Sequence, residues 1–297
     1  MKIRKSHRKL AVRMSLMLGC LFMAAQPLAA QQAEPLTVSD VHFQRGGADF
    51  LMLGVSADSS LWFLSPDSVT LGLDSLKARS IGLLRLPLTA PAIPLFSLVA
   101  SQCSERAIDL IAAVSDDLLA DYCDALIPIL QRAKNLVSIE VTGEVDERRW
   151  NRLRAALPAV LLSGRHEGAD YVTLPLNPMQ RGWTSRGSLG EALGSVYLKT
   201  QRLVFNEQRS ILSDGKPIVL GPVVYPRDHM FASPGSTTIR RDALIDYLRQ
   251  MCYPLHVDHA QIAGIIVGQW QPGPTGSSWA TLYATDTTLE KLREESH

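Results

Sequence analysis

The stretch "DGKPIVLGPVVYPRD", residues 214–228, has the pattern of a buried strand that leads toward a functional site. Gly215 ends a preceding helical pattern, and the apolar run 218–220 is typical of a parallel strand that is buried on both faces. Gly221 lies where this strand would end, which is the usual place for a charged functional side chain in an α/β fold. The next residue is Pro222. The stretch therefore predicts a parallel α/β fold whose functional position carries a proline.

Short apolar runs alternate with amphipathic stretches along the rest of the chain, which predicts a single (β/α)8 TIM barrel. The stretch "VHFQRGGADFLMLGV", residues 41–55, alternates around two glycines and predicts a short β-hairpin before the first barrel strand. Helical patterns cover 65–80, 115–135 and 240–251. The expected strands are 51–55, 82–86, 93–99, 137–141, 159–162, 171–174, 217–220 and 262–267.

One link in this series is too short. About six residues separate Leu86 from Ile93, whereas a crossover between parallel strands needs a dozen or more. Two explanations are open. Either the second helix is missing and the barrel is irregular around strands two and three, or residues 93–99 are not the third strand.

The first 30 residues have the pattern of a secretory signal peptide, with a basic start, the apolar run "MSLMLGCLFMAA" and a small-residue cleavage site after Ala30. We expect an exported, periplasmic or secreted protein with one mature domain, 31–297; an uncleaved anchor is the alternative. Without the six basic residues of the leader, 24 Lys and Arg face 29 Asp and Glu. This mildly acidic balance argues against a nucleic-acid-binding surface.

The cysteines indicate no chemistry. Cys103, Cys123 and Cys252 remain after the leader, and none has metal-ligand spacing. Cys103 and Cys123 can pair in an oxidising compartment, but buried free thiols are an equal alternative. We expect no metal and no cofactor.

The ends of the expected strands, taken in order, resemble those of clan A glycoside hydrolases, the cellulase-like and mannanase-like (β/α)8 enzymes. "FQRGGADFLMLGVSA" resembles their opening hairpin and first strand, and "GLDSLKARSIGLLRLPL" their first helix and second strand. "LVSIEVTGEVD", "GADYVTLPLNP" and "GKPIVLGPVVYP" resemble strands four, six and seven, and "IAGIIVGQWQPGPTGSSWATLY" resembles strand eight. The resemblance covers about 41–285.

The resemblance implies a set of site residues. Carried over position by position, the acid/base falls on Glu144, with Gly143 in place of the usual asparagine. The nucleophile falls on Pro222, which can neither attack a sugar nor stabilise an oxocarbenium ion. Arg85, Tyr225 and Trp270 match the pattern of sugar-binding positions.

A retaining glycosidase needs two carboxyl groups about 5–5.5 Å apart, and an inverting enzyme about 6.5–9.5 Å. Glu144 with Asp58 or Asp228 is a candidate for such a pair. Arg85 needs a partner if it is buried, and Glu144 is one candidate. The Asn-Glu pair in "FNEQ", residues 205–208, lies in a long amphipathic pattern, so we interpret Glu207 as part of a solvated helix face.

Three functions fit this sequence. The first is an exported barrel that binds or processes polysaccharide or oligosaccharide without the usual retaining mechanism, a pseudoenzyme. The second is an active glycosidase that uses Glu144 with a relocated carboxylate. The third is a non-catalytic structural protein of the cell envelope that binds a protein partner. Fold alone does not choose among them.

Overall fold

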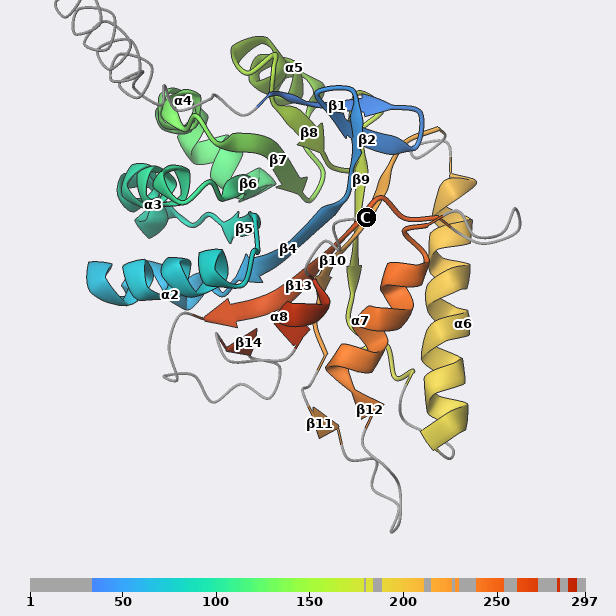
Figure 1. Cartoon of the computed structure of the whole chain (residues 1–297). Coiled ribbons are helices and arrows are strands. Elements are labelled where there is room, and N and C mark those ends of the chain that lie inside the picture. The colour runs from blue at the N-terminus through green and yellow to red at the C-terminus, as the bar shows by residue number, and fades with distance from the viewer. Residues whose placement is uncertain are drawn as a thin grey trace, which may run out of the picture. The chain divides into compact units, whose positions relative to one another are not determined.

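The computed structural model describes residues 34–178, 180–183, 189–210, 215–225, 228–229, 239–253, 261–271, 282–283 and 288–292. Eight parallel strands form a nearly closed (β/α)8 barrel (Figure 1). Along the chain they are β4 (Met52–Ala57), β5 (Leu83–Pro87), β6 (Asp109–Ser115), β7 (Leu136–Thr142), β8 (Leu161–Ser163), β9 (Val172–Leu176), β10 (Ile218–Val223) and β13 (Gly264–Gln271). Neighbours in the chain are neighbours in the barrel, and β13 closes it against β4.

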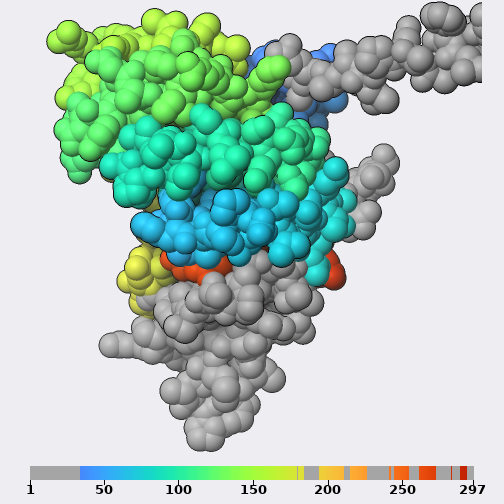
Figure 2. All heavy atoms as spheres, turned by 90° about the vertical axis from the view of Figure 1, so that its left-hand side faces the viewer, coloured from blue at the N-terminus to red at the C-terminus, as the bar shows by residue number. Residues whose placement is uncertain are grey.

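Helices follow most of the strands and lie outside them. They are α2 (Pro66–Ala78), α3 (Ile93–Glu105), α4 (Asp116–Arg132), α5 (Glu147–Ala156), α6 (Leu189–Gln208), α7 (Arg241–Gln250) and α8 (Thr288–Lys291). Helices α2 to α5 lie side by side in chain order and form one continuous face (Figure 2). Shorter elements are the 3-10 turns η1 (Ser59–Phe63) and η2 (Ala90–Ala92) and the strands β11 (Asp228–His229), β12 (Ile239–Arg240) and β14 (Leu282–Tyr283).

The sequence sets the helix starts through capping side chains. The Ser65 side chain accepts from the Ser68 N–H, and Pro66 occupies the first turn of α2. Ser115 and Asp146 cap α4 and α5 in the same way. These caps come directly after strands or short loops, so each helix begins close to the carboxyl end of the strand before it.

Two apolar clusters form the core. The larger one lies between the strands and the helices, as in other α/β barrels. The smaller one fills the interior of the barrel near the start of the strands. It is formed by Leu36, Phe43, Met52, Leu83, Ile111, Leu161, Tyr171, Val219, Ala263 and Ile266.

The predicted N-terminal hairpin is confirmed and belongs to a small antiparallel sheet of β1 (Leu36–Ser39), β2 (His42–Arg45) and β3 (Ala48–Phe50). Phe43 is fully buried and meets the ring of Tyr171 edge to face, with 5.2 Å between centroids. Arg45 forms an ion pair with Asp109 at the start of β6, at 2.6 Å. The hairpin therefore closes the end of the barrel where the strands begin.

Residues 93–99 are not the third strand; they lie in α3, and the third strand is β6. Pro94 in the first turn and the spacing of buried Ile93, Phe96 and Val99 are those of a helix. The barrel is regular here, because β5 and β6 pair in continuous register from Leu83–Asp109 to Pro87–Ala113.

The irregularity lies between strands five and six instead. The link between β8 and β9, residues 164–171, contains no helix and is shorter than an ordinary crossover. A single bridge, Ser163 with Tyr171, joins the two strands. The ring of helices is therefore interrupted between α5 and α6.

Cys103, Cys123 and Cys252 are free and buried, so the structure contains no Cys103–Cys123 disulfide. Burial raises the pKa of the Cys103 and Cys252 thiols to about 12. Within the described residues, no helix combines the length and the apolar character that a membrane span requires.

Candidate functional site

The centre of the site is an ion pair inside the barrel. Arg85 of β5 donates from Nε to Glu140 Oε2 at 2.8 Å and from Nη2 to Oε1 at 2.7 Å. Its third donor, Nη1, reaches Ser56 Oγ of β4 at 3.0 Å. Both charged residues are buried. Their partnership provides the charge neutralisation that burial requires.

This geometry corrects the expected partner of Arg85. The partner is Glu140, within β7, and not Glu144, which follows the strand. Glu140 lies two residues after Ser138, whose hydroxyl contacts Tyr171 inside the barrel. Because alternate residues of a strand point to the same side, Glu140 faces the interior as well. Its two carboxylate oxygens both accept from one guanidinium, so this carboxylate is already committed.

Hydroxyl groups surround the ion pair. Ser138 donates to the carbonyl of Leu161 at 3.0 Å, so the Tyr171 hydroxyl, 2.9 Å away, donates to Ser138. The hydroxyls of Ser163 and Thr173 lie 2.9 Å apart, across the junction of β8 and β9. The middle of the barrel is therefore polar, in contrast to the apolar cluster near the start of the strands.

Burial and charge perturb the titration of these groups. Burial lowers the pKa of Arg85, but the charge and hydrogen bonds of Glu140 outweigh that effect, and the net pKa is raised. Burial and, secondly, the negative charge of Glu140 raise the pKa of Tyr171. Tyr171 is therefore a neutral hydrogen-bond donor at physiological pH, and Arg85 carries its positive charge.

A cavity of about 260 Å³ adjoins this polar layer. Arg85 and Glu140 of the ion pair line it, and so does Pro222 of β10. Among the described residues, the lining consists of Arg85, Glu140, Val141, Thr142, Gly143, Ser163, Gly164, Arg165, Val172, Thr173, Leu174, Pro175, Glu207, Gly221 and Pro222. Most of these residues belong to β7, β8, β9 and β10 or follow them directly, at the carboxyl ends where TIM barrels carry their sites.

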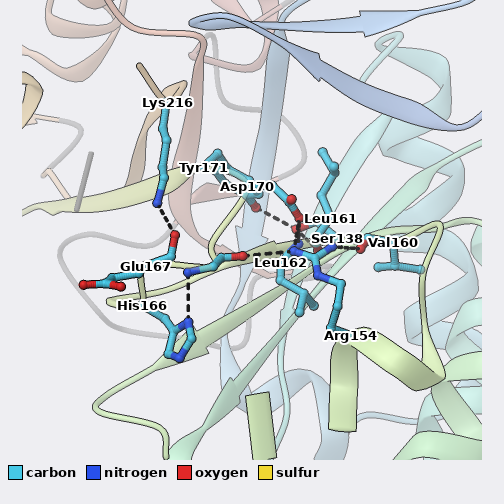
Figure 3. Close-up of polar contacts among 11 residues, drawn as sticks. Ser138, Arg154, Val160, Leu161, Leu162, His166, Glu167, Asp170, Tyr171 and Lys216 are labelled. Atoms are coloured by element: carbon cyan, nitrogen blue, oxygen red, sulfur yellow. Dashed lines mark hydrogen bonds and ion pairs between the residues drawn. The ribbon is translucent and has the colours of Figure 1, made fainter. Parts of the chain in front are cut away.

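Polar contacts hold the link between β8 and β9 in place (Figure 3), and its first residues, Gly164 and Arg165, line this cavity. Asp170 accepts from the Leu162 N–H at 2.7 Å and forms an ion pair with Arg154 of α5, also at 2.7 Å. The Lys216 ammonium donates to the Glu167 carbonyl at 2.7 Å. The His166 ring stacks on Trp150 with 4.4 Å between centroids. The link is therefore held from three sides even though it has no helix.

The predicted site residues lie in several places. Arg85 and Pro222 line the cavity, as stated above. Glu144 is exposed on the loop after β7 and is not among the lining residues. The Asp58 carboxylate accepts from the Ser60 N–H at 2.8 Å and caps η1. A catalytic role for either acid stays a prediction.

The aromatic candidates lie in the core of the described structure. Tyr225 and Trp270 are both fully buried, and neither the Tyr225 hydroxyl nor the Trp270 indole N–H has a hydrogen-bond partner among the described residues. Burial raises the pKa of Tyr225 to about 12. Asp228 lies in β11, and its side chain is outside the described part of the chain.

Sequence reasoning missed several lining residues. Glu140 shares the alternation of "SIEVT" with Ser138 and Thr142, which was the available signal for an inward-facing acid. Glu207 was interpreted as part of a solvated helix face; it is half-buried and lines the cavity. Ser163, Arg165 and Thr173 had no motif that distinguished them. The described residues contain no group of three metal-binding side chains.

No family model and no curated protein matches the sequence, whereas the fold is similar to solved glycoside hydrolases. The endo-1,4-beta-mannanase of Rhizomucor miehei has a TM-score of 0.61 at 10% identity, covering 87% of this chain and 97% of that one. The hyperthermostable endo-1,4-beta-D-mannanase of Thermotoga petrophila RKU-1 has a TM-score of 0.53 at 11% identity, covering 82% and 98%. A glycoside hydrolase family 5 structure from Bacteroides vulgatus has a TM-score of 0.54 at 11% identity, covering 86% and 68%. At this identity the similarity shows the fold alone, a (β/α)8 barrel of the kind found in these hydrolases.

Proposed function

We propose that this chain is an exported glycoside-hydrolase-like barrel that binds a saccharide in the cavity above Arg85 and Glu140 and does not hydrolyse it by the retaining mechanism. One observation carries the proposal: the position matched to the nucleophile is Pro222, and it lines this cavity. A proline supplies no carboxylate for attack on the anomeric carbon.

The other acids of the cavity support the same reading. Among the described residues, Glu140 and Glu207 are the carboxylates in its lining. Glu140 has both oxygens committed to Arg85, so its protonation or attack on a sugar would leave a buried arginine without its partner. Glu207 comes from α6 rather than from a strand end. A retaining enzyme needs a pair of available carboxylates about 5–5.5 Å apart, and the lining residues that the structure describes do not supply one.

The remaining groups suit a polyhydroxyl ligand. Ser163, Thr142 and Thr173 offer hydroxyls, and Arg85 and Arg165 offer N–H donors. Ligand sites of this kind use a few placed polar groups on a preformed surface to orient the ligand. The mannanases that share the fold are a reason to begin with mannan-derived ligands.

The test is calorimetric titration of the mature chain with β-1,4-linked mannooligosaccharides and cello-oligosaccharides, alongside an assay for released reducing ends. We expect binding without release. Thr142→Val should weaken binding about three- to tenfold, because one hydrogen bond is worth about 1 kcal/mol. Thr37→Val is the matched control, since Thr37 is exposed on β1 of the N-terminal sheet and does not line the cavity, and it should leave affinity unchanged.

Two results would overturn the proposal. Release of sugar that is lost in Glu144→Gln or Glu207→Gln would identify an active glycosidase. Failure to bind any saccharide of the panel would favour the non-catalytic, partner-binding alternative.

Export is proposed from the leader sequence. The basic start, the apolar run and Ala30 fit a cleaved signal peptide. N-terminal sequencing of the protein recovered from the producing cell should begin at residue 31. A mature product that retains residues 1–30 would indicate a membrane anchor instead.

A further inference from the structure

The cavity reaches both faces of the barrel wall. Arg85, Glu140 and Thr173 belong to the polar layer inside the barrel. Val172 and Leu174 belong to the outer apolar cluster, on the side of α6. Both groups line the same cavity, together with Glu207 of α6. The cavity therefore extends through the wall and is more than a depression at the mouth.

The interruption lies where β8 and β9 separate. β8 ends at Ser163, and its only bridge to the next strand is the one between Ser163 and Tyr171. Beyond that bridge, Gly164 and Arg165 turn away while β9 continues to Leu176. Residues 164–171 form no helix, so the β8–β9 link itself adds no helical cover over this gap. On the outer side, α6 contributes Glu207 to the cavity lining.

The gap is a built feature of the structure. The attachments of the link through Asp170, Lys216 and His166 keep it against α5 and against the residues before β10. Gly164 also leaves no room for a larger residue, since a Cβ there would lie 3.0 Å from the carbonyl oxygen of Val141. The backbone beside the gap is thus closely packed and fixed in place.

The size and charge of the cavity restrict its ligand. Its volume of about 260 Å³ is below the roughly 300–1,000 Å³ of ordinary ligand sites, so it suits one sugar ring rather than several. Among the described lining residues, two arginines, Arg85 and Arg165, are matched by two glutamates, Glu140 and Glu207. A neutral sugar residue fits this balance better than an acidic one.

The geometry points to side entry: one terminal residue of a neutral oligosaccharide occupies the cavity, and the rest of the chain leaves between β8 and β9 past Arg165. This inference rests on the proposed saccharide binding. It deepens that function by assigning an end-recognising site, because the Arg85–Glu140 ion pair lines the cavity on its inner side. Arg165 is exposed at the edge of the gap, where its guanidinium can contact the second sugar.

The experiment varies the length of the oligosaccharide and, separately, fills the gap between β8 and β9 with a larger side chain. Calorimetric titration uses mannose and β-1,4-linked mannobiose, mannotriose and mannohexaose against wild type, Arg165→Trp and Arg165→Ala. We expect affinity to rise from one residue to two and then to stay constant. Arg165→Trp should weaken binding at least about tenfold, because the larger side chain blocks the gap. Arg165→Ala should weaken it about threefold, because it removes only one contact at the edge of the site.

Arg148→Trp is the matched control, because Arg148 is exposed near the start of α5 and does not line this cavity. It should bind as wild type does, and thermal unfolding should confirm that all variants fold. Wild-type binding that strengthens steadily up to mannohexaose, or that survives Arg165→Trp within twofold, would overturn side entry and leave saccharide binding intact. Absence of binding by wild type would overturn the proposed function itself.

Discussion

Two junctions of the same barrel differ in how they are sealed. Between β6 and β7, paired residues run from Leu110 to Ser115 with one register shift after Leu110, and α4 packs outside them. Between β8 and β9, one bridge remains and a short link replaces the helix. The first junction is continuous wall. The second is the place where the cavity passes through the wall.

The difference shows how a site can be made from an interruption of a regular fold. A complete helix outside β8 and β9 would cover the gap with apolar side chains, as α4 covers its strands. Here the loss of that cover is offset by specific polar attachments around Asp170 and by the stacking of His166 on Trp150. Removal of a polar side chain should therefore cost more stability at the β8–β9 junction than on the helices that cover the continuous one.

The largest effect is expected inside the cavity. Glu140→Ala leaves Arg85 buried without its partner, which should lower the free energy of unfolding by about 3–5 kcal/mol. Urea denaturation of the purified variant measures this loss. The double substitution Arg85→Met with Glu140→Leu removes both charges and should restore most of it. Equal instability of the single and double variants would show that the ion pair is not the cause.

A smaller effect is expected at the link. Asp170→Ala removes the hydrogen bond to the Leu162 N–H and the ion pair with Arg154. We expect a loss of about 2 kcal/mol in unfolding free energy, since the amide loses a charged acceptor. The comparison is Asp124→Ala on α4, whose partner is Arg152 and whose side chain is exposed. That variant should lose less than about 1 kcal/mol, and a loss equal to that of Asp170→Ala would remove the distinction between the junctions.

The smallest effect is a pH dependence at the closed end of the barrel. Burial raises the pKa of Asp109, and the charge of Arg45 opposes that shift only in part. A raised carboxyl pKa means that the folded state holds the proton more tightly than the unfolded state. The contribution of Asp109 to stability is therefore full below its ordinary pKa of about 3.9 and is lost as the pH rises through the folded value.

Chemical denaturation of wild type and Asp109→Asn at several pH values measures this contribution. The wild type should lose stability relative to the variant as the pH rises above about 4. A difference that stays flat, or that changes in favour of the wild type, would contradict the assignment.

Parts of this structure were accessible from the sequence. The barrel, its N-terminal hairpin and the capped helix at 65–80 follow from local patterns, and these were confirmed. Residues 93–99 were misassigned because a short apolar run fits a buried strand and a buried helix equally well. The proline at position 94 was the signal that separated them.

The site was less accessible because its contacts join distant parts of the chain. The pairing of Arg85 with Glu140 depends on the relative register of β5, β6 and β7, which local patterns do not specify. The gap at β8 and β9 was more predictable. The expected strands 159–162 and 171–174 were already too close for a helical crossover, by the same criterion that was applied to 86–93.

The most direct test of this account is a crystal structure of the mature chain with mannotriose. We predict one sugar ring in the cavity, within hydrogen-bond distance of Ser163 or Thr173, with the second ring between β8 and β9 beside Arg165. A sugar chain that lies along the mouth of the barrel, with the cavity empty, would contradict it.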